Sequence, residues 1–195
     1  VCDSIGLMRY PEFRLDLVRA GAVMYGVTPL NTPLTATAGM RTPFRFSTRI
    51  ARLRRLAEGE GVGYDYTYRA PAGGAFIATL PVGYADGYKR CLSGVGSVVV
   101  RGRRAPVVGL VCMDQCTVDV SAVPGVAEGD EVLLLGGDPA GPGGPSAAVP
   151  VLEMADWAKT NRNDVICSIG RRVPRVYSEG GRVVEEIDNV LGGNA

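Results

Sequence analysis

The stretch SVVVRGRRAPVVGLVC, residues 97–112, decides the fold class of this chain. It holds two short apolar runs, rich in β-branched residues, on either side of a polar segment that contains a glycine. This pattern predicts two strands joined by a turn. FRFSTRI (44–50) alternates apolar and polar residues, DEVLLLGG (130–137) is another apolar run, and many of the 27 glycines end such runs. We therefore expect a mainly β domain that is barrel-like or a sandwich.

Three other segments of this half predict helix or loop. In residues 150–160, Val151, Met154, Ala155 and Ala158 fall near helical spacing, which predicts a short helix. RLRRLAEGE (52–60) is interpreted as a solvated helical face that ends at Gly59. GGDPAGPGGPS (136–146) predicts a loop, and no Gly-Lys-Ser/Thr follows that would make it a phosphate loop.

The first part of the chain has a different pattern. RLDLVRAG (14–21) predicts a strand with Leu15 and Leu17 on one side and Asp16 and Val18 on the other. VTPLNTPLTATAG (27–39) is rich in threonine, proline and small residues, which is typical of a hinge or linker.

Composition excludes several classes of partner. Lys and Arg total 21 and Asp and Glu total 20, so no charge excess exists to attract nucleic acid or a membrane surface. No apolar run approaches the roughly 20 residues of a membrane helix, and no secretory signal pattern is visible. The odd number of cysteines, five, argues against a disulfide framework and favours a reducing cytoplasm, with each cysteine a small buried hydrophobe. Cys112 and Cys116 have no histidine to complete a zinc site, so we expect no metal.

LPVGYADGYKR, residues 80–90, raises a question of chemistry because the chain has no histidine to act as a base. Tyr84 stands between glycines, which allow a sharp turn with a projecting ring. A phenol ordinarily has a pKa of about 10, so it can act as a base only beside a cation or on an unusually acidic proton. The cation would be Lys, Arg or a group of another polypeptide. The alternative is a turn tyrosine packed at the edge of a domain.

Four segments resemble the C-terminal part of alanine racemases, in the order of that family: LDLVRAGAVMYG (15–26), LPVGYADGYKR (80–90), APVVGLVCMDQCTVDVS (105–121) and IGRRVPRVY (169–177). The resemblance implies a pyridoxal-phosphate enzyme with an N-terminal (β/α)8 barrel and a C-terminal β-domain. Residues 1–38 would be the last strands and helix of that barrel. Residues 39–195 would be the β-domain, barrel-like with a few short helices.

The same resemblance implies roles for individual residues. Tyr84 aligns with the catalytic tyrosine, the base for one face of the substrate, which acts in the active site of the second subunit of a head-to-tail homodimer. A lysine that also binds the cofactor is the opposite base. Met113 aligns with the residue whose backbone N–H holds the substrate carboxylate, and Asp114 adjoins it. Met113 is also expected to limit the pocket size and favour alanine.

The resemblance places the cofactor contacts in the first part of the chain. Arg19 aligns with the arginine that faces the pyridine nitrogen, Ser4 with a serine that bonds the phosphate, and Gly21 and Ala22 would offer backbone N–H groups. The cofactor lysine is missing, since Lys89 and Lys159 are the only lysines and neither lies in a matching motif. The chain alone is therefore expected to be inactive.

The implied function is the cytoplasmic interconversion of L- and D-alanine, which supplies a cell-wall precursor. Two positions depart from the family pattern. Leu110 replaces an arginine of the substrate corridor, and Arg171 replaces a phosphate-binding tyrosine of some members. Two alternatives stay open: a racemase half for serine or another amino acid, such as those attached to resistance-associated membrane proteins, and a non-catalytic β-domain for dimerisation or partner binding.

Overall fold

The computed structural model describes residues 1–27, 42–137, 147–191 and 193–194, and its largest element is an antiparallel sheet. The seven strands of this sheet are β1 (Arg45–Arg49), β2 (Arg52–Leu56), β5 (Ala75–Leu80), β6 (Ser97–Val100), β7 (Arg103–Val108), β8 (Cys116–Asp119) and β9 (Glu131–Gly136). Their order is β1-β9-β6-β7-β8-β5-β2. The prediction of a mainly β chain with short strands is confirmed, as are the strands expected around residues 44–50, 97–112 and 130–137.

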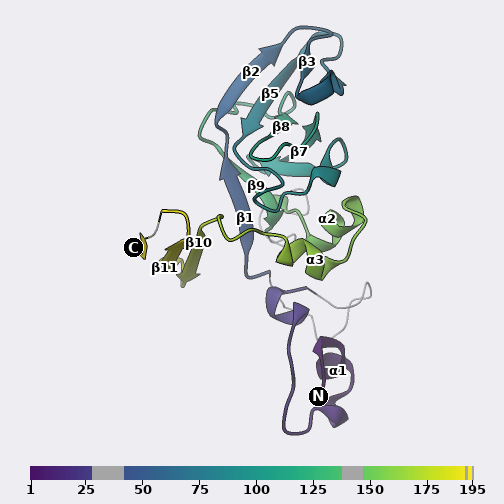
Figure 1. The fold of residues 1–195 in the computed structure, drawn as a ribbon, viewed down its shortest axis with the longest axis vertical. Helices are drawn as coiled ribbons and strands as arrows, with labels where there is room; N and C mark the ends of the chain where they lie inside the picture. Colours follow the sequence, from purple (N-terminus) through teal and green to yellow (C-terminus); the bar gives the residue numbers. More distant parts are fainter. Residues whose placement is uncertain (28–41, 138–146, 192, 195) are drawn as a thin grey trace.

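The sheet is strongly curled. Its two end strands, β1 and β2, are consecutive in the chain and joined by only Ile50 and Ala51. Figure 1 shows them as one nearly continuous ribbon that passes from one end of the domain to the other. These two joining residues are held by neighbouring strands or turns on both sides. Ile50 N–H donates to the Asp130 carbonyl at 3.0 Å, and Ala51 N–H donates to the Thr79 carbonyl at 3.0 Å. The barrel-like character expected from the sequence follows from this curl.

The core lies inside the curled sheet and under two helices, α2 (Val151–Trp157) and α3 (Arg162–Cys167). Its largest fully buried aliphatic side chains are Leu80, Leu92, Leu134, Leu135, Val98, Val100, Val107, Val111, Val118 and Val120. Helix α2 contacts β9 and buries Val151, Met154 and Ala155, which confirms the helix predicted there. The apolar burial of these side chains is the main favourable contribution to folding.

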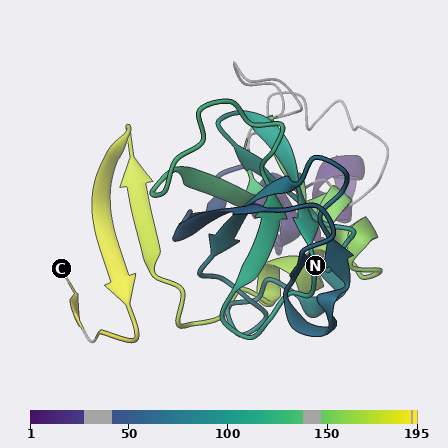
Figure 2. The same cartoon turned by 90° about the horizontal axis from the view of Figure 1, so that it is seen from above.

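Short elements extend the β-domain. They are β3 (Gly61–Val62), the 3-10 turn η4 (Tyr64–Tyr66), β4 (Tyr68–Arg69), the 3-10 turn η5 (Arg90–Leu92), β10 (Arg175–Glu179), β11 (Arg182–Asp188) and β12 (Gly193–Asn194). Figure 2 shows the β10–β11 hairpin standing apart from the main sheet. Its side chains are largely exposed, including Val176, Tyr177, Val183 and Val184.

The helical interpretation of residues 52–60 is wrong, because these residues begin with strand β2. Leu53 and Leu56 are three apart, a spacing that also fits a helix, but β2 pairs with β5 from Arg52↔Thr79 to Leu56↔Ala75. The two leucines point to opposite faces of the strand. Leu53 packs against the main core, and Leu56 belongs to a second cluster that also contains Ile77. Tertiary pairing therefore overrides the local pattern.

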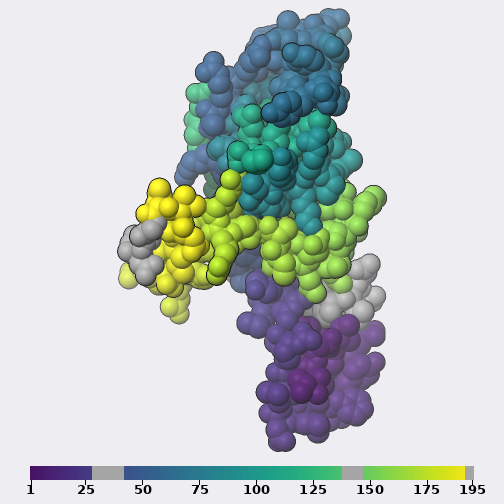
Figure 3. Space-filling model, in the orientation of Figure 1, coloured from purple at the N-terminus to yellow at the C-terminus, as the bar shows by residue number. Residues whose placement is uncertain are grey.

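The strand predicted over residues 14–21 is also wrong. This part of the chain holds α1 (Ser4–Arg9), η1 (Pro11–Phe13) and η2 (Ala22–Tyr25). Leu15 has a positive φ of 45°, which breaks an extended strand, and both Leu15 and Leu17 are exposed. Val18 alone makes a bridge, parallel to Cys2. Residues 1–27 form the purple body at the lower end of Figures 1 and 3.

The expectation that every cysteine is buried needs correction. Cys2 and Cys116 are buried, but Cys91 and Cys167 are exposed and Cys112 is intermediate, because these three lie in turns or at a helix end rather than in the sheet. Within the described ranges, no cluster of three or more His, Cys, Asp or Glu residues could hold a metal ion. None of the helices described here has the length and apolarity to cross a bilayer. The predicted linker at 27–39 and the loop at 136–146 fall mainly outside the described residues.

Candidate functional site

Strand pairing brings the Tyr84 turn and Met113 together. Strands β5 and β8 are antiparallel neighbours, and the last pair of their register is Leu80 with Cys116. Residues that follow β5 must therefore lie beside residues that precede β8. The backbone confirms this contact: Tyr84 N–H donates to the Cys112 carbonyl at 3.0 Å, and Ala85 N–H donates to the Met113 carbonyl at 3.0 Å.

Position 83 must be glycine because its backbone lies very close to the backbone of residues 112–113. A Cβ added at Gly83 would lie 2.2 Å from the Cys112 carbonyl oxygen and 2.4 Å from the Met113 carbonyl oxygen. Neither backbone atom can move without breaking the two hydrogen bonds that hold the turn. The glycine before the tyrosine thus serves contact between two backbones, not a special dihedral angle.

Gly87, at the other end of the turn, meets a third segment. It has a φ of +103°, and an added Cβ would lie 2.3 Å from the Ser168 carbonyl oxygen. Gly170 N–H donates to the Asp86 carbonyl at 2.9 Å, and the Ser168 hydroxyl donates to the Gly87 carbonyl at 3.2 Å. The turn from Gly83 to Gly87 is therefore held between residues 112–113 and residues 168–170.

Charged side chains make a second set of links around the turn. Asp86 accepts from Gly83 N–H at 2.8 Å through one carboxylate oxygen and from Arg172 Nε at 2.6 Å through the other. Arg172 Nη2 also donates to Asp114 Oδ1 at 2.6 Å. These two carboxylates raise the pKa of the Arg172 guanidinium, so the arginine stays charged.

Tyr84 and Tyr88, four residues apart, lie in opposite environments. Tyr84 is 41% exposed, so its ring is available at the surface of the domain. Tyr88 is completely buried, and among the described groups its hydroxyl has no hydrogen-bond partner. Burial raises the pKa of the Tyr88 phenol well above its ordinary value. Of these two phenols, only Tyr84 can meet a molecule outside its own domain.

The other positions of interest lie around this turn. Met113 and Asp114 are exposed in the tight turn that Cys112 N–H closes on the Gln115 carbonyl at 2.8 Å. Leu110 lies beside Gly63, whose added Cβ would be 3.6 Å from the Leu110 nitrogen, at the start of the turn that exposes Tyr64 and Tyr66.

Arg171, beside Arg172 in the chain, is exposed. Its carbonyl accepts a hydrogen bond from the Asn189 side chain at 2.9 Å.

The residues predicted to bind a cofactor gather in the N-terminal part. The parallel bridge between Cys2 and Val18, with the bond from Arg19 N–H to the Cys2 carbonyl at 2.7 Å, sets two backbone segments side by side. Ser4 follows the first segment, and Gly21 follows the second. Ser4 is buried, at 5% exposed, and its hydroxyl accepts from Gly21 N–H at 2.9 Å.

Arg19 and the start of η2 complete this group. A Cβ added at Gly21 would lie 2.9 Å from Arg19 Nη1 and 3.5 Å from Ser4 Oγ, so the guanidinium and the hydroxyl both border the glycine. Val23 N–H also points to Ser4 Oγ, at 3.5 Å, and Ala22 begins η2. The Gly21 and Val23 N–H groups are directed at Ser4 Oγ, and a hydroxyl and a guanidinium side by side are donors that can bind an anion.

The two groups of residues are separate in this chain. Among the described residues, no hydrogen bond or ion pair joins the Ser4 group to the Tyr84 turn, although Val27 packs into the core of the β-domain. Residues 1–27 project from the lower end of the molecule in Figure 3. The chain therefore presents two surfaces that have no direct polar contact with each other.

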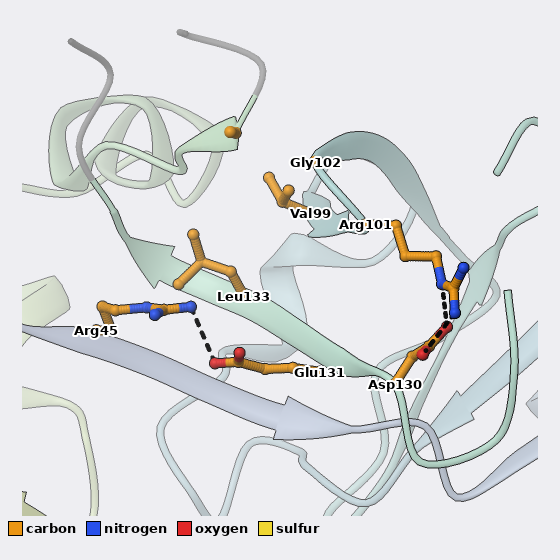
Figure 4. A pocket seen from close by; sticks show the side chains of 8 residues that line it. Arg45, Val99, Arg101, Gly102, Asp130, Glu131 and Leu133 are labelled. Carbon is orange, nitrogen blue, oxygen red and sulfur yellow. Dashed lines mark hydrogen bonds and ion pairs between the residues drawn. The ribbon is translucent and has the colours of Figure 1, made fainter. Parts of the chain in front are cut away.

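A pocket of about 300 Å³ lies elsewhere, between β1, β6 and β9 (Figure 4). Its charges are already paired: Arg45 with Glu131 at 2.9 Å and Arg101 with Asp130 at 2.7 Å. None of the predicted site residues lines it. The candidate residues therefore lie outside this hollow.

Sequence reasoning missed the contributions of Asp86, Arg172 and Ser168. Asp86 stands in the quoted stretch GYADG and Arg172 in IGRRVPRVY, but 86 residues separate them. Nothing local indicates that the two side chains meet. The usable signal was an aspartate three residues after a glycine, a spacing that allows the side chain to accept the glycine N–H.

Comparison with known proteins identifies the family of this chain. Residues 44–177 match the family described as "Alanine racemase, C-terminal domain". The alanine racemase of Desulfovibrio desulfuricans is 43% identical over 177 residues, which are 91% of this chain and 45% of that protein. The chain thus spans about half the length of the curated relatives it matches.

Solved structures agree. Alanine racemase of Clostridium difficile 630 in complex with cycloserine has a TM-score of 0.87 and 32% identity, covering 98% of this chain and 48% of that one. Alanine racemase of Bartonella henselae with covalently bound pyridoxal phosphate has a TM-score of 0.74 and 28% identity, covering 87% and 44%.

Proposed function

Because the chain belongs to the alanine racemase family, we propose that it is the C-terminal part of an enzyme that interconverts L- and D-alanine with pyridoxal phosphate. One observation supports this most: Tyr84 is exposed on a turn whose backbone is bonded to Cys112 and Met113. A phenol and a backbone segment that can hold a carboxylate are thus presented side by side. In the proposed reaction the phenol works on one face of the amino acid while the backbone segment orients its carboxylate.

The N-terminal group fits the phosphate and ring of the cofactor. Ser4 Oγ and the N–H groups of Gly21 and Ala22 would hold the phosphate, at the place where (β/α)8 barrels often bind one, and Gly21 N–H would exchange its bond to Ser4 Oγ for one to the phosphate. Arg19 would donate to the pyridine nitrogen, which must then accept the bond and stay neutral, because arginine does not deprotonate in proteins. When bound, pyridoxal phosphate withdraws electrons from the substrate and acidifies its Cα–H bond.

Tyr84 has one task in this proposal. Its phenol oxygen removes or returns the Cα proton on one face of the substrate, and a lysine serves the other face. Two bases on opposite faces invert the centre without any rotation of the substrate. Met113 N–H orients the substrate carboxylate, and the Met113 side chain limits the pocket to a small substituent.

The proposal also defines what this chain lacks. Residues 1–38 are the end of the cofactor-binding barrel, and residues 39–195 are the β-domain. The lysine that binds the cofactor lies outside this chain, so the 195 residues alone should not racemise alanine. Two groups with no polar contact in one chain support assembly as a homodimer, in which the Tyr84 turn of one subunit faces the Ser4 and Arg19 group of the other. The enzyme would supply D-alanine to the cell wall from the cytoplasm.

The test is a chimera in which residues 1–195 follow the N-terminal part of the Desulfovibrio desulfuricans alanine racemase. We expect it to interconvert L- and D-alanine when loaded with pyridoxal phosphate. Tyr84→Phe should lower kcat/KM by about 10²- to 10⁴-fold in both directions, the range typical of a lost acid–base group. Chiral chromatography of the product measures both rates.

A matched control is Tyr64→Phe, which removes a hydroxyl from another exposed tyrosine outside the Tyr84 turn. A folded, loaded chimera that does not racemise alanine would contradict the proposal. Full activity of Tyr84→Phe would show that Tyr84 is not the base. Faster turnover of L-serine than of L-alanine would move the substrate from alanine to serine.

A further inference from the structure

We propose that Arg172 is a positioning residue, which sets the place of Tyr84 relative to the segment that binds the substrate carboxylate. The inference rests on the proposed function. It follows from the two hydrogen bonds of the Arg172 guanidinium, one to Asp86 in the Tyr84 turn and one to Asp114 beside Met113. Within the described part of the chain, no hydrogen bond or ion pair joins Arg172 to the Tyr84 phenol, so Arg172 acts through Asp86 and Asp114.

The geometry is a continuous chain of polar contacts. Gly83 N–H donates to one oxygen of Asp86 at 2.8 Å, and the other oxygen of Asp86 accepts from Arg172 Nε at 2.6 Å. Arg172 Nη2 then donates to Asp114, next to Met113, at 2.6 Å. The planar guanidinium keeps its two donors at a fixed separation, which a flexible ammonium group would not. The peptide before Tyr84 is thus tied to the residue after Met113.

Magnitudes indicate an effect on geometry more than on stability. The Arg172 side chain is 40% exposed, and exposed ion pairs typically contribute about 0–1 kcal/mol to folding. A displacement of about 1 Å at a reacting group can nevertheless lower a rate about 100-fold. The backbone bonds at Tyr84 and Ala85 keep the turn in contact with residues 112–113. Arg172 restrains the position of Asp86, and through it the Gly83 N–H, relative to Asp114.

The test uses the active chimera and the variant Arg172→Gln. We expect kcat/KM to fall by about 10- to 100-fold. A second quantity separates positioning from simple loss of folded enzyme: exchange of the Cα hydrogen with deuterated water without inversion. If Tyr84 is displaced, the opposite base still exchanges the hydrogen of one enantiomer, so the ratio of exchange to inversion rises. Loss of active molecules lowers both rates equally and leaves the ratio unchanged.

Arg101→Gln is the matched control. Like Arg172, Arg101 donates through two nitrogens, but both bonds go to the single carboxylate of Asp130, at 2.7 and 3.3 Å. The Arg101 side chain is 48% exposed and lies in the turn between β6 and β7. We expect both its kcat/KM and its exchange ratio to match the parent. Tyr84→Phe should raise the ratio more than Arg172→Gln does.

A readout without cofactor completes the experiment. In the cofactor-free protein, Arg172→Gln should accelerate amide hydrogen exchange at Gly83 and its neighbours in the turn, and Arg101→Gln should not. An unchanged ratio and unchanged exchange at Gly83, with Tyr84→Phe impaired, would overturn the role of Arg172 and leave the proposed function intact. Full activity of Tyr84→Phe would instead overturn the proposed function on which this role rests.

Discussion

The Tyr84 turn and residues 1–27 carry the two halves of one proposed site, yet they are held in different ways. The turn is fixed by two segments of its own domain, residues 112–114 and residues 168–172. Residues 1–27 are held by short helical turns, one isolated bridge and a few hydrogen bonds such as Gly21 N–H to Ser4, and Ala22 and Val27 at their end pack against the core of the β-domain. Their exposed apolar side chains are Tyr10, Phe13, Leu15, Leu17, Val18, Met24 and Tyr25, together with Val1.

The difference indicates where each half obtains its rigidity. The β-domain holds the Tyr84 turn with contacts present in this chain, whereas residues 1–27 leave many apolar side chains exposed. Exposed apolar side chains gathered in one part of a protein are typical of an interaction surface. The following changes either remove this contrast or measure it.

The largest effect is expected at Gly87. Gly87→Ala introduces strain at a φ of +103° and a contact at 2.3 Å with the Ser168 carbonyl oxygen, and we expect about 3 kcal/mol of lost stability. Gly73→Ala is the control, because Gly73 has a φ of +86° with nothing within 4 Å of an added Cβ. It should cost about 1 kcal/mol. Urea unfolding gives both free energies, and equal losses would mean that the turn is not locked by Ser168.

A smaller effect is expected at Ser4, in the less constrained half. Ser4→Ala removes the acceptor of Gly21 N–H, and amide exchange at Gly21 should become about tenfold faster, which corresponds to about 1.4 kcal/mol.

The counterpart in the β-domain is Ser93, whose hydroxyl accepts from Val111 N–H at 2.9 Å. Ser93→Ala should accelerate exchange at Val111 less, because packing around buried Val111 opposes local opening. An equal acceleration at both sites would remove the proposed contrast.

The smallest effect concerns alkaline pH. The Tyr68 hydroxyl donates to Asp119 at 2.9 Å, and burial together with this bond raises the pKa of Tyr68 to about 12. The folded state thus keeps a proton that the unfolded state loses near pH 10, so the stabilisation is complete below pH 10 and disappears as pH rises through 12. Tyr68→Phe should be about 1 kcal/mol less stable than the parent at pH 8.

That difference should shrink towards zero by pH 12. Urea unfolding at a series of pH values measures it, and contributions of the other tyrosines cancel because both proteins contain them. A difference that stays constant from pH 8 to pH 12 would contradict the assigned cause of the pKa shift.

The sequence predicted the strands whose apolar pattern matches their burial. Residues 97–112 and 130–137 form strands because their β-branched and leucine side chains enter one core, and helix α2 buries the residues that its spacing indicated. Leu53 and Leu56 led to the wrong prediction of a helix. A strand that buries one leucine on each face, in separate clusters, can have the same three-residue spacing as a helix. Residues 14–21 were wrongly predicted as a strand, because an alternating pattern does not form a strand without a neighbouring strand to pair with.

The sequence predicted individual residues of the candidate site but not the contacts between them. Tyr84 and Met113 were identified by resemblance, and the register of β5 and β8 explains why they are neighbours. The links through Arg172 depend on side chains 86 and 58 residues apart, which no local pattern indicates. Strand pairing has to be known before such contacts can be expected.

The crowding at Gly83 has a consequence for how this protein can evolve. Every amino acid that one nucleotide change can substitute for glycine carries a Cβ, and here that atom would fall 2.2 Å from a carbonyl oxygen. No single mutational step therefore leads away from glycine at position 83 without moving the Cys112 backbone. Variation in homologous genes should accumulate around this codon and spare it.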